Sequence, residues 1–113
     1  MIQVFHNPRC TKSRECLAFL EELGQKYEII KYLEVAPTVA ELELIIQKLG
    51  IQPIDLVRKK EKIWIEKYKN QQLSSDEIVA ILIQNPRLIE RPIIINGDKA
   101  LIGRPKEVVA TII

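Results

Sequence analysis

The sequence predicts an α/β protein with a four-stranded mixed sheet flanked by helices and a helical insertion between its two halves. Near the start of the chain a helical pattern stands between two short apolar runs, which is typical of a β-α-β unit with parallel strands. The dipeptide Asn96-Gly97 separates two later apolar runs, and it is a strong signal for a hairpin turn between antiparallel strands. Between about residues 38 and 86 the signals are mainly helical.

The first half of the chain is expected to form a strand, a helix and a second strand. The short apolar alternation in residues 1–5 predicts the first strand. Residues 11–23 predict a helix, because apolar side chains recur there at helical spacing, namely Cys16, Leu17, Phe19, Leu20 and Leu23. Gly24 is a natural helix stop, and residues 27–32 predict the second strand.

The insertion is expected to begin with a helix that Thr38 caps and that Gly50 ends. Glu41 is placed to complete a capping box with Thr38, since its carboxylate can accept a hydrogen bond from the backbone N–H of the cap residue. After a less regular stretch, the charged run of residues 58–62 predicts a solvated turn between short helices.

A further helix is expected before the second half of the sheet. Ser74 or Ser75 is its candidate N-cap, and Glu77 is placed for a capping box with Ser74. This helix is expected to end at Asn85-Pro86, because the residue before a proline disfavours the α conformation.

The last part of the chain predicts a strand, a hairpin and a helix. Residues 92–95 form the expected buried strand, residues 99–102 return beside it, and Pro105 opens a final helix at a first-turn position. Its apolar side is Val108, Val109 and Ile112. The order β-α-β, helical insertion, β-β-α is that of the thioredoxin-like architecture. We therefore expect residues 1–113 to form a single domain with an insertion at about 38–86.

Composition and charge exclude several classes of protein. The chain has 113 residues, of which 47% are hydrophobic and 28% charged, as is typical of a soluble globular domain. The net charge of +2 is too small to imply a nucleic-acid partner, and no apolar run has the length of a membrane span. One histidine and two cysteines do not form a zinc-binding cluster, so no metal is expected. Two cysteines and no signal peptide predict a protein of the reducing cytoplasm. We also expect the protein to be a monomer.

Cys10 is the candidate reactive residue, because it stands at the junction between the first strand and the first helix. At a helix N-terminus, unpaired backbone N–H groups and the positive end of the helix dipole favour an anion. Arg9, Lys12 and Arg14 add positive charge, and these conditions lower a thiol pKa. Cys16 has apolar neighbours instead, as a buried structural cysteine does.

The spacing of the thiols indicates a mechanism that uses one of them. Ser13 stands where a Cys-x-x-Cys pair would have its second cysteine; it cannot resolve a mixed disulfide, but its hydroxyl can hydrogen-bond the Cys10 thiolate. Cys16 lies about 240° around the helix from Cys10, so the two cannot meet while the helix is intact. We therefore expect an external thiol to finish the reaction. Cys16 is either a core residue or a resolving thiol reached only by local unfolding.

Three arginines are candidates for binding an oxyanion, because each stands at the end of a predicted element. They are Arg58 in the charged run, Arg91 before Pro92, and Arg104 before Pro105. The planar guanidinium makes bidentate, charge-assisted hydrogen bonds to oxyanions, but each arginine taken alone can equally be an ordinary surface residue. Pro92 is a candidate structural residue and a candidate cis proline, which the sequence alone does not decide.

His6 is the single histidine, four residues before Cys10. One interpretation is that it orients or helps to deprotonate the thiol, and the other is that it simply ends the first strand.

Several segments together resemble the glutaredoxin-linked arsenate reductase (ArsC) family. The run His6-Asn7-Pro8-x-Cys10-x-x-Ser13-Arg14 is similar to the active-site loop of that family. The later segments follow in the same order, namely Tyr32-Leu33-Glu34, Pro37-Thr38, Leu56-Val57-Arg58-Lys59, Asn85-Pro86-x-Leu88-Ile89-x-Arg91-Pro92-Ile93 and Gly103-Arg104-Pro105. The resemblance covers nearly the whole chain.

The resemblance implies a thioredoxin-like fold, Cys10 as the nucleophile, and Arg58, Arg91 and Arg104 as oxyanion ligands. In the family, arsenate adds to the cysteine thiolate, glutathione attacks the adduct, and glutaredoxin regenerates the thiol as arsenite is released. Glutathione is then a co-substrate, and no bound cofactor is implied. Similar chains include glutathione-dependent thiol reductases of other substrates and Spx-like transcription regulators that bind RNA polymerase. Spx regulators usually carry Cys-x-x-Cys at this loop, so Ser13 argues against that alternative.

Overall fold

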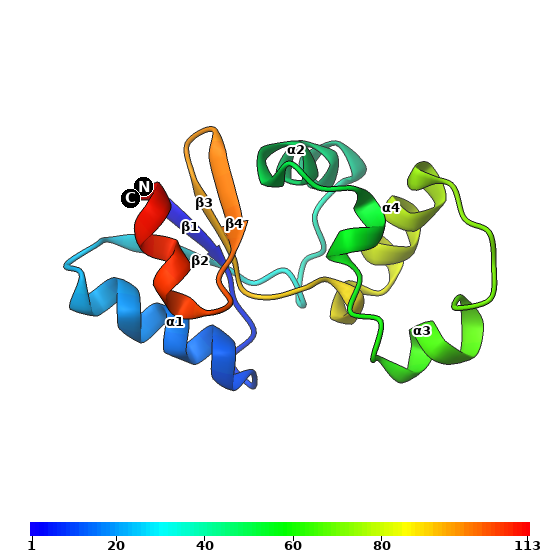
Figure 1. Cartoon of the computed structure of the whole chain (residues 1–113), viewed down its shortest axis with the longest axis horizontal. Helices are drawn as coiled ribbons and strands as arrows, with labels where there is room; N and C mark the ends of the chain where they lie inside the picture. The colour runs from blue at the N-terminus through cyan, green and yellow to red at the C-terminus, as the bar shows by residue number, and fades with distance from the viewer. The chain divides into compact units, whose positions relative to one another are not determined.

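The computed structural model describes all 113 residues, which cluster in two compact units (Figure 1). Unit 1 consists of Met1–Val35 and Arg91–Ile113, and unit 2 consists of Ala36–Glu90. The helical insertion that the sequence predicts at about 38–86 corresponds to unit 2. That the whole chain acts as a single domain stays a prediction. No helix combines the length and the apolar character that crossing a membrane requires.

Unit 1 contains the predicted four-stranded mixed sheet. Its strands are β1 (Ile2–Phe5), β2 (Tyr27–Ile30), β3 (Ile93–Asn96) and β4 (Lys99–Ile102), in the order β2-β1-β3-β4. β1 is parallel to β2 and antiparallel to β3, and β4 returns antiparallel to β3. Gly97 lies in the hairpin turn with a φ of 64°, a left-handed conformation that glycine adopts without strain.

The second strand is two residues shorter than the prediction of 27–32. Ile30 pairs with Phe5, the last residue of β1, so the chain beyond it has no strand to pair with. It turns instead, and the backbone N–H groups of Glu34 and Val35 both donate to the Lys31 carbonyl. Tyr32 is still buried, and its ring stacks on Phe5 with the ring centres 5.4 Å apart.

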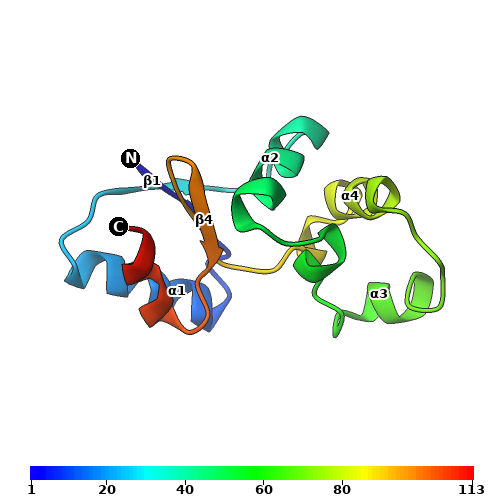
Figure 2. The ribbon, with the colours of Figure 1, turned by 45° about the horizontal axis from the view of Figure 1, so that its top comes forward.

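One face of the sheet is covered by two helices that lie side by side, α1 (Thr11–Glu22) and the 3₁₀ helix η3 (Lys106–Ile112) (Figures 1 and 2). Side chains from the sheet and both helices form one core, namely Ile2, Val4, Cys16, Leu20, Ile94 and Val109. This packing holds the first turn of α1 in place relative to the ends of the strands.

The final helix differs from the prediction in two respects. It is a 3₁₀ helix rather than an α-helix, and Pro105 is its N-cap rather than a residue of its first turn. Pro105 has a ψ of 162°, which is extended. The segment has seven residues, which is longer than most 3₁₀ runs.

Unit 2 consists of short helices, and both predicted capping boxes are confirmed. The helices are α2 (Val39–Leu49), η1 (Pro53–Leu56), α3 (Lys62–Lys67), α4 (Ser75–Gln84) and η2 (Pro86–Leu88). Thr38 with Glu41 caps α2, and Ser74 with Glu77 caps α4. Gly50 ends α2 in the left-handed conformation, as the sequence predicts.

Candidate active site

Cys10 lies at the N-terminus of α1, as the sequence predicts. It is the N-cap residue, in an extended conformation, and its carbonyl accepts the first helical hydrogen bond from the Arg14 N–H at 3.0 Å. The Cys10 N–H in turn donates to the Asn7 carbonyl, also at 3.0 Å. The thiol is therefore held where the first N–H groups of the helix have no carbonyl partner within the helix. Cys10 is 8% exposed, so only a small part of its surface is in contact with solvent.

The surroundings of Cys10 favour its thiolate. Burial on its own raises the pKa of the thiol, because it removes the charged form from water. A hydrogen bond from the Arg91 side chain, the backbone N–H groups of Ser13 and Lys12 and the Arg91 charge outweigh burial, and the pKa of Cys10 falls below its usual value. The direction is the one expected from the sequence, although the main cation is Arg91 rather than the arginines and lysine next in sequence.

Two of the three predicted arginines lie beside Cys10. Arg104 donates from Nη2 to the Cys10 sulfur at 3.5 Å and from Nε to the Arg91 carbonyl at 2.7 Å. Arg91 lies close enough to the thiol to lower its pKa, and the buried Nε of Arg91 has no hydrogen-bond partner. The β3–β4 hairpin explains the pairing: Ile93 lies opposite Ile102, so the residues just outside its open end are neighbours. Two guanidinium groups beside one thiolate can bind a tetrahedral oxyanion.

Ser13 binds His6 rather than the thiol. Its Oγ lies 2.6 Å from His6 Nδ1 and accepts a hydrogen bond from the Asn7 N–H at 3.1 Å. The hydroxyl predicted to reach the Cys10 sulfur is thus engaged elsewhere, and the Ser13 backbone N–H takes that place. Burial, with a smaller effect of the Arg14 charge, lowers the pKa of His6 and favours its neutral form. His6 therefore supports the first turn of α1 through Ser13.

Arg14 braces the loop before the helix. Its Nη1 donates to the Pro8 carbonyl at 2.8 Å and its Nη2 to the Thr11 hydroxyl at 3.2 Å. Both contacts lie within the segment that carries Cys10, so Arg14 supports the site by holding this loop in place.

Pro92 is buried, and the Arg91–Pro92 peptide bond is cis. The sequence left this point open. The Arg104–Pro105 peptide bond is cis as well.

Cys16 is a core residue. It is 0% exposed, and burial raises the pKa of its thiol to about 11. At neutral pH it is therefore protonated and a poor nucleophile, in contrast to Cys10. The alternative, that local unfolding lets Cys16 act as a resolving thiol for Cys10, stays a prediction.

Arg58 belongs to unit 2, where two carboxylates bind it. Its Nη1 lies 3.4 Å from Glu61 Oε1 and its Nε lies 3.9 Å from Glu90 Oε1. A short backbone pairing explains the second contact, because the Arg58 N–H donates to the Leu88 carbonyl and places Arg58 beside the segment that ends at Glu90. Glu61 could have been predicted from its i+3 spacing, whereas nothing in the sequence indicated Glu90. That Arg58 shares a site with Arg91 and Arg104 stays a prediction.

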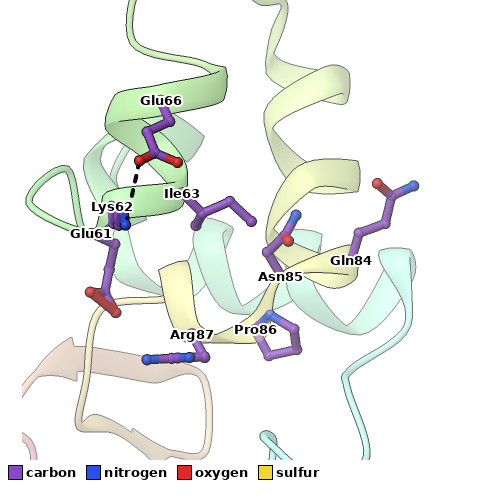
Figure 3. Close-up of a pocket in the computed structure, with 8 residues that line it drawn as sticks. All are labelled: Glu61, Lys62, Ile63, Glu66, Gln84, Asn85, Pro86 and Arg87. Atoms are coloured by element: carbon purple, nitrogen blue, oxygen red, sulfur yellow. Dashed lines mark ion pairs between the residues drawn. The ribbon is translucent and has the colours of Figure 1, made fainter.

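Unit 2 also contains a pocket of about 560 Å³, beside α3 and the junction of α4 with η2 (Figure 3). Charged side chains of both signs line it together with Ile63 and Pro86, and Lys62 forms an ion pair with Glu66 at 3.7 Å (Figure 3). None of the predicted site residues lines it. The structure contains no group of three or more histidine, cysteine or acidic side chains that could hold a metal ion.

Comparisons with known proteins agree with the resemblance seen in the sequence. The model of the ArsC family matches residues 5–112. An arsenate reductase of Haemophilus influenzae is 44% identical over 112 residues, which is 97% of each chain. An arsenate reductase of Neisseria meningitidis is 41% identical over 108 residues, which is 94% of this chain and 92% of the relative. The solved arsenate reductase of Vibrio cholerae superposes with a TM-score of 0.94, at 42% identity, over 99% of this chain and 97% of the other.

Proposed function

The chain belongs to the ArsC family, and we propose that it reduces arsenate to arsenite with Cys10 as the nucleophile. The observation that carries the proposal is a thiol at a helix N-terminus with two guanidinium groups beside it, one of them 3.5 Å from the sulfur. A thiolate supplies the nucleophile, and the cations bind the negative oxygens of a tetrahedral oxyanion. The relatives from Haemophilus influenzae and Neisseria meningitidis, both named arsenate reductase, indicate arsenate as that oxyanion.

In the first step the Cys10 sulfur forms a bond to arsenic. One arsenate oxygen leaves as water after it gains protons, and arsenic stays in its +5 state. Arg91 and Arg104 bind the remaining oxygens. This step needs the thiolate, which the hydrogen bonds from Arg91 and from the N-terminus of α1 favour.

The next steps use external thiols, because the second cysteine of the chain is in the core. Glutathione displaces a second oxygen from arsenic as water. A glutaredoxin thiol then attacks the glutathione sulfur, and the electron pair of the broken arsenic–sulfur bond stays on arsenic, which becomes +3. Water releases arsenite and restores the Cys10 thiol. In sum, arsenate and two thiols give arsenite, one mixed disulfide and one water. A reducing cytoplasm supplies such thiols.

Arg58 is the third oxyanion ligand of this proposal, on the family resemblance alone. Its ion pairs with Glu61 and Glu90 restrict the movement of its guanidinium group. An arsenate oxygen would have to compete with these carboxylates or bind the guanidinium edge that they leave open.

A coupled assay tests the function. Arsenate-dependent consumption of NADPH is measured with glutathione, glutathione reductase and glutaredoxin, and we expect turnover that stops when arsenate or glutaredoxin is omitted. Cys10→Ser should be inactive. Reduction of glutathione mixed disulfides without any turnover of arsenate would instead indicate a general thiol reductase. Stable capture of RNA polymerase, again without arsenate turnover, would indicate an Spx-like regulator.

A further inference from the structure

Cys16 packs against Gly103, in the short segment that carries Arg104. A Cβ atom added to Gly103 would lie 2.9 Å from the Cys16 sulfur and 3.1 Å from Pro92 Cγ, closer than side-chain packing allows. The φ of Gly103 lies outside the left-handed range. Glycine is therefore required at this position for space, because the backbone passes directly over the sulfur, and not for conformation.

These contacts lead to both arginines. Pro92 follows Arg91, and Gly103 precedes Arg104. The Gly103 N–H donates to the Pro92 carbonyl at 2.9 Å, and Arg104 Nε donates to the Arg91 carbonyl at 2.7 Å. The two segments thus form one hydrogen-bonded group, and a displacement of Gly103 moves both guanidinium groups relative to the Cys10 sulfur.

Cys10 and Cys16 are also joined by a stiff element. Cys10 caps α1 and Cys16 lies near its middle, about 9 Å further along the helix axis. Leu20, Ile94 and Val109 surround Cys16 in the core, so its side chain has little room to move aside. The same helix therefore sets the position of the thiol at one point and the contact with Gly103 at another.

We propose that Cys16 is a positioning residue: its sulfur, packed against Gly103, sets how closely Arg91 and Arg104 approach the Cys10 sulfur. The proposal rests on the proposed function only in that Cys10 is the nucleophile. It gives the second cysteine a structural task in the site, carried out by its volume and not by its thiol chemistry.

The test follows the titration of Cys10 through the pH dependence of its alkylation, with the labelled cysteine identified by mass spectrometry. Gly103→Ala should displace Arg104 and raise the alkylation midpoint by about one pH unit, which is the usual effect of losing a close cation. Cys16→Ala, combined with Gly103→Ala, removes the sulfur that the new methyl group meets. The double variant should bring the midpoint back most of the way to that of the wild type.

Gly97→Ala is the matched control. It lies in the same hairpin and is strained by its φ of 64°, but an added Cβ would meet nothing within 4 Å. It should lower the unfolding temperature without moving the Cys10 midpoint. A midpoint unchanged in Gly103→Ala, or one that moves equally in Gly97→Ala, would overturn the proposal.

If Gly103→Ala does not fold, the double variant alone tests the positioning role of Cys16. A folded double variant that titrates like the wild type supports the proposal, whereas one that is unfolded or keeps a raised midpoint contradicts it. None of these measurements uses arsenate, so a failure here is distinct from a failure of the proposed reductase activity.

Discussion

Helix α1 carries two cysteine thiols in opposite environments, one at its N-terminus and one near its middle. Cys10 caps the helix beside Arg91 and Arg104, and the pKa of its thiol is lowered. Cys16 lies six residues on, in the core, where burial raises the pKa of its thiol to about 11. Burial acts on both thiols, so the difference comes from the hydrogen bonds and positive charge that only the helix N-terminus and the hairpin end provide.

Replacing each cysteine in turn should give the largest contrast. Cys10→Ser should abolish arsenate turnover, since a serine hydroxyl is protonated at neutral pH and forms no comparable adduct. In the wild type, iodoacetamide at pH 7 should label Cys10 and leave Cys16 unlabelled until the protein unfolds. Peptide mapping after timed quenching measures this. Faster labelling of Cys16, or a Cys10 that titrates near ~8.5 like a free thiol, would reverse the assignment.

Removing Arg91 or Arg104 should lower the arsenate activity and make the Cys10 thiol less acidic. Each charge-assisted hydrogen bond contributes about 1.5–3 kcal/mol, so Arg91→Ala and Arg104→Ala should each lower kcat/KM for arsenate by roughly tenfold to a hundredfold. Both should also raise the Cys10 alkylation midpoint.

Lysine variants sharpen this prediction. Arg91→Lys and Arg104→Lys should restore part of the thiol titration, because they keep the charge, but less of the arsenate activity, because an ammonium group lacks the bidentate fork. Arg58→Ala should lower arsenate activity to a similar extent without moving the Cys10 midpoint. Unchanged activity in Arg58→Ala would remove Arg58 from the oxyanion site.

The sequence predicted the features that depend on neighbouring residues. Cys10 at a strand–helix junction and the capping boxes at Thr38 and Ser74 are local patterns, and each is confirmed. The features it missed join distant segments. The contact of Gly103 with Cys16 and the pairing of Arg58 with Glu90 depend on how strands and loops pack, and a single sequence carries no local signal for either. The partner of Ser13 was missed because two possible partners for its hydroxyl, the Cys10 thiolate and the His6 ring, lie within a few residues of it.

The raised pKa of the Cys16 thiol should make the free energy of unfolding fall at alkaline pH. The unfolded thiol ionises near ~8.5, whereas the buried one stays protonated up to about 11. As pH rises through this window the unfolded state loses its proton first, so Cys16 reduces the free energy of unfolding, by about 2 kcal/mol at pH 10. Urea unfolding at pH 7 and pH 10 measures the loss.

Cys16→Ser is the control, since the serine side chain at this position does not titrate in this pH range. The difference in unfolding free energy between wild type and Cys16→Ser should shrink or change sign at pH 10. Cys10 has the opposite sign. Its lowered pKa adds stability that is present above the unfolded value and is lost as the pH falls through the folded value. If the wild type and Cys16→Ser lose the same free energy of unfolding between pH 7 and pH 10, Cys16 ionises in the folded protein as readily as in the unfolded one.

Ser13→Ala should have the smallest effect on the comparison, although it removes a buried hydroxyl 2.6 Å from His6. The Ser13 backbone N–H, which faces the Cys10 sulfur, is retained, so the alkylation midpoint should move by less than about half a pH unit. The unfolding free energy should fall by about 1–3 kcal/mol, because the Asn7 N–H and the His6 ring lose their partner in a buried site. Urea unfolding and pH-dependent alkylation of one preparation separate the two effects. A shift of a full pH unit without loss of stability would instead mean that the hydroxyl itself acts on the thiolate, and His6 would then belong to the chemistry of Cys10 and not only to the support of its loop.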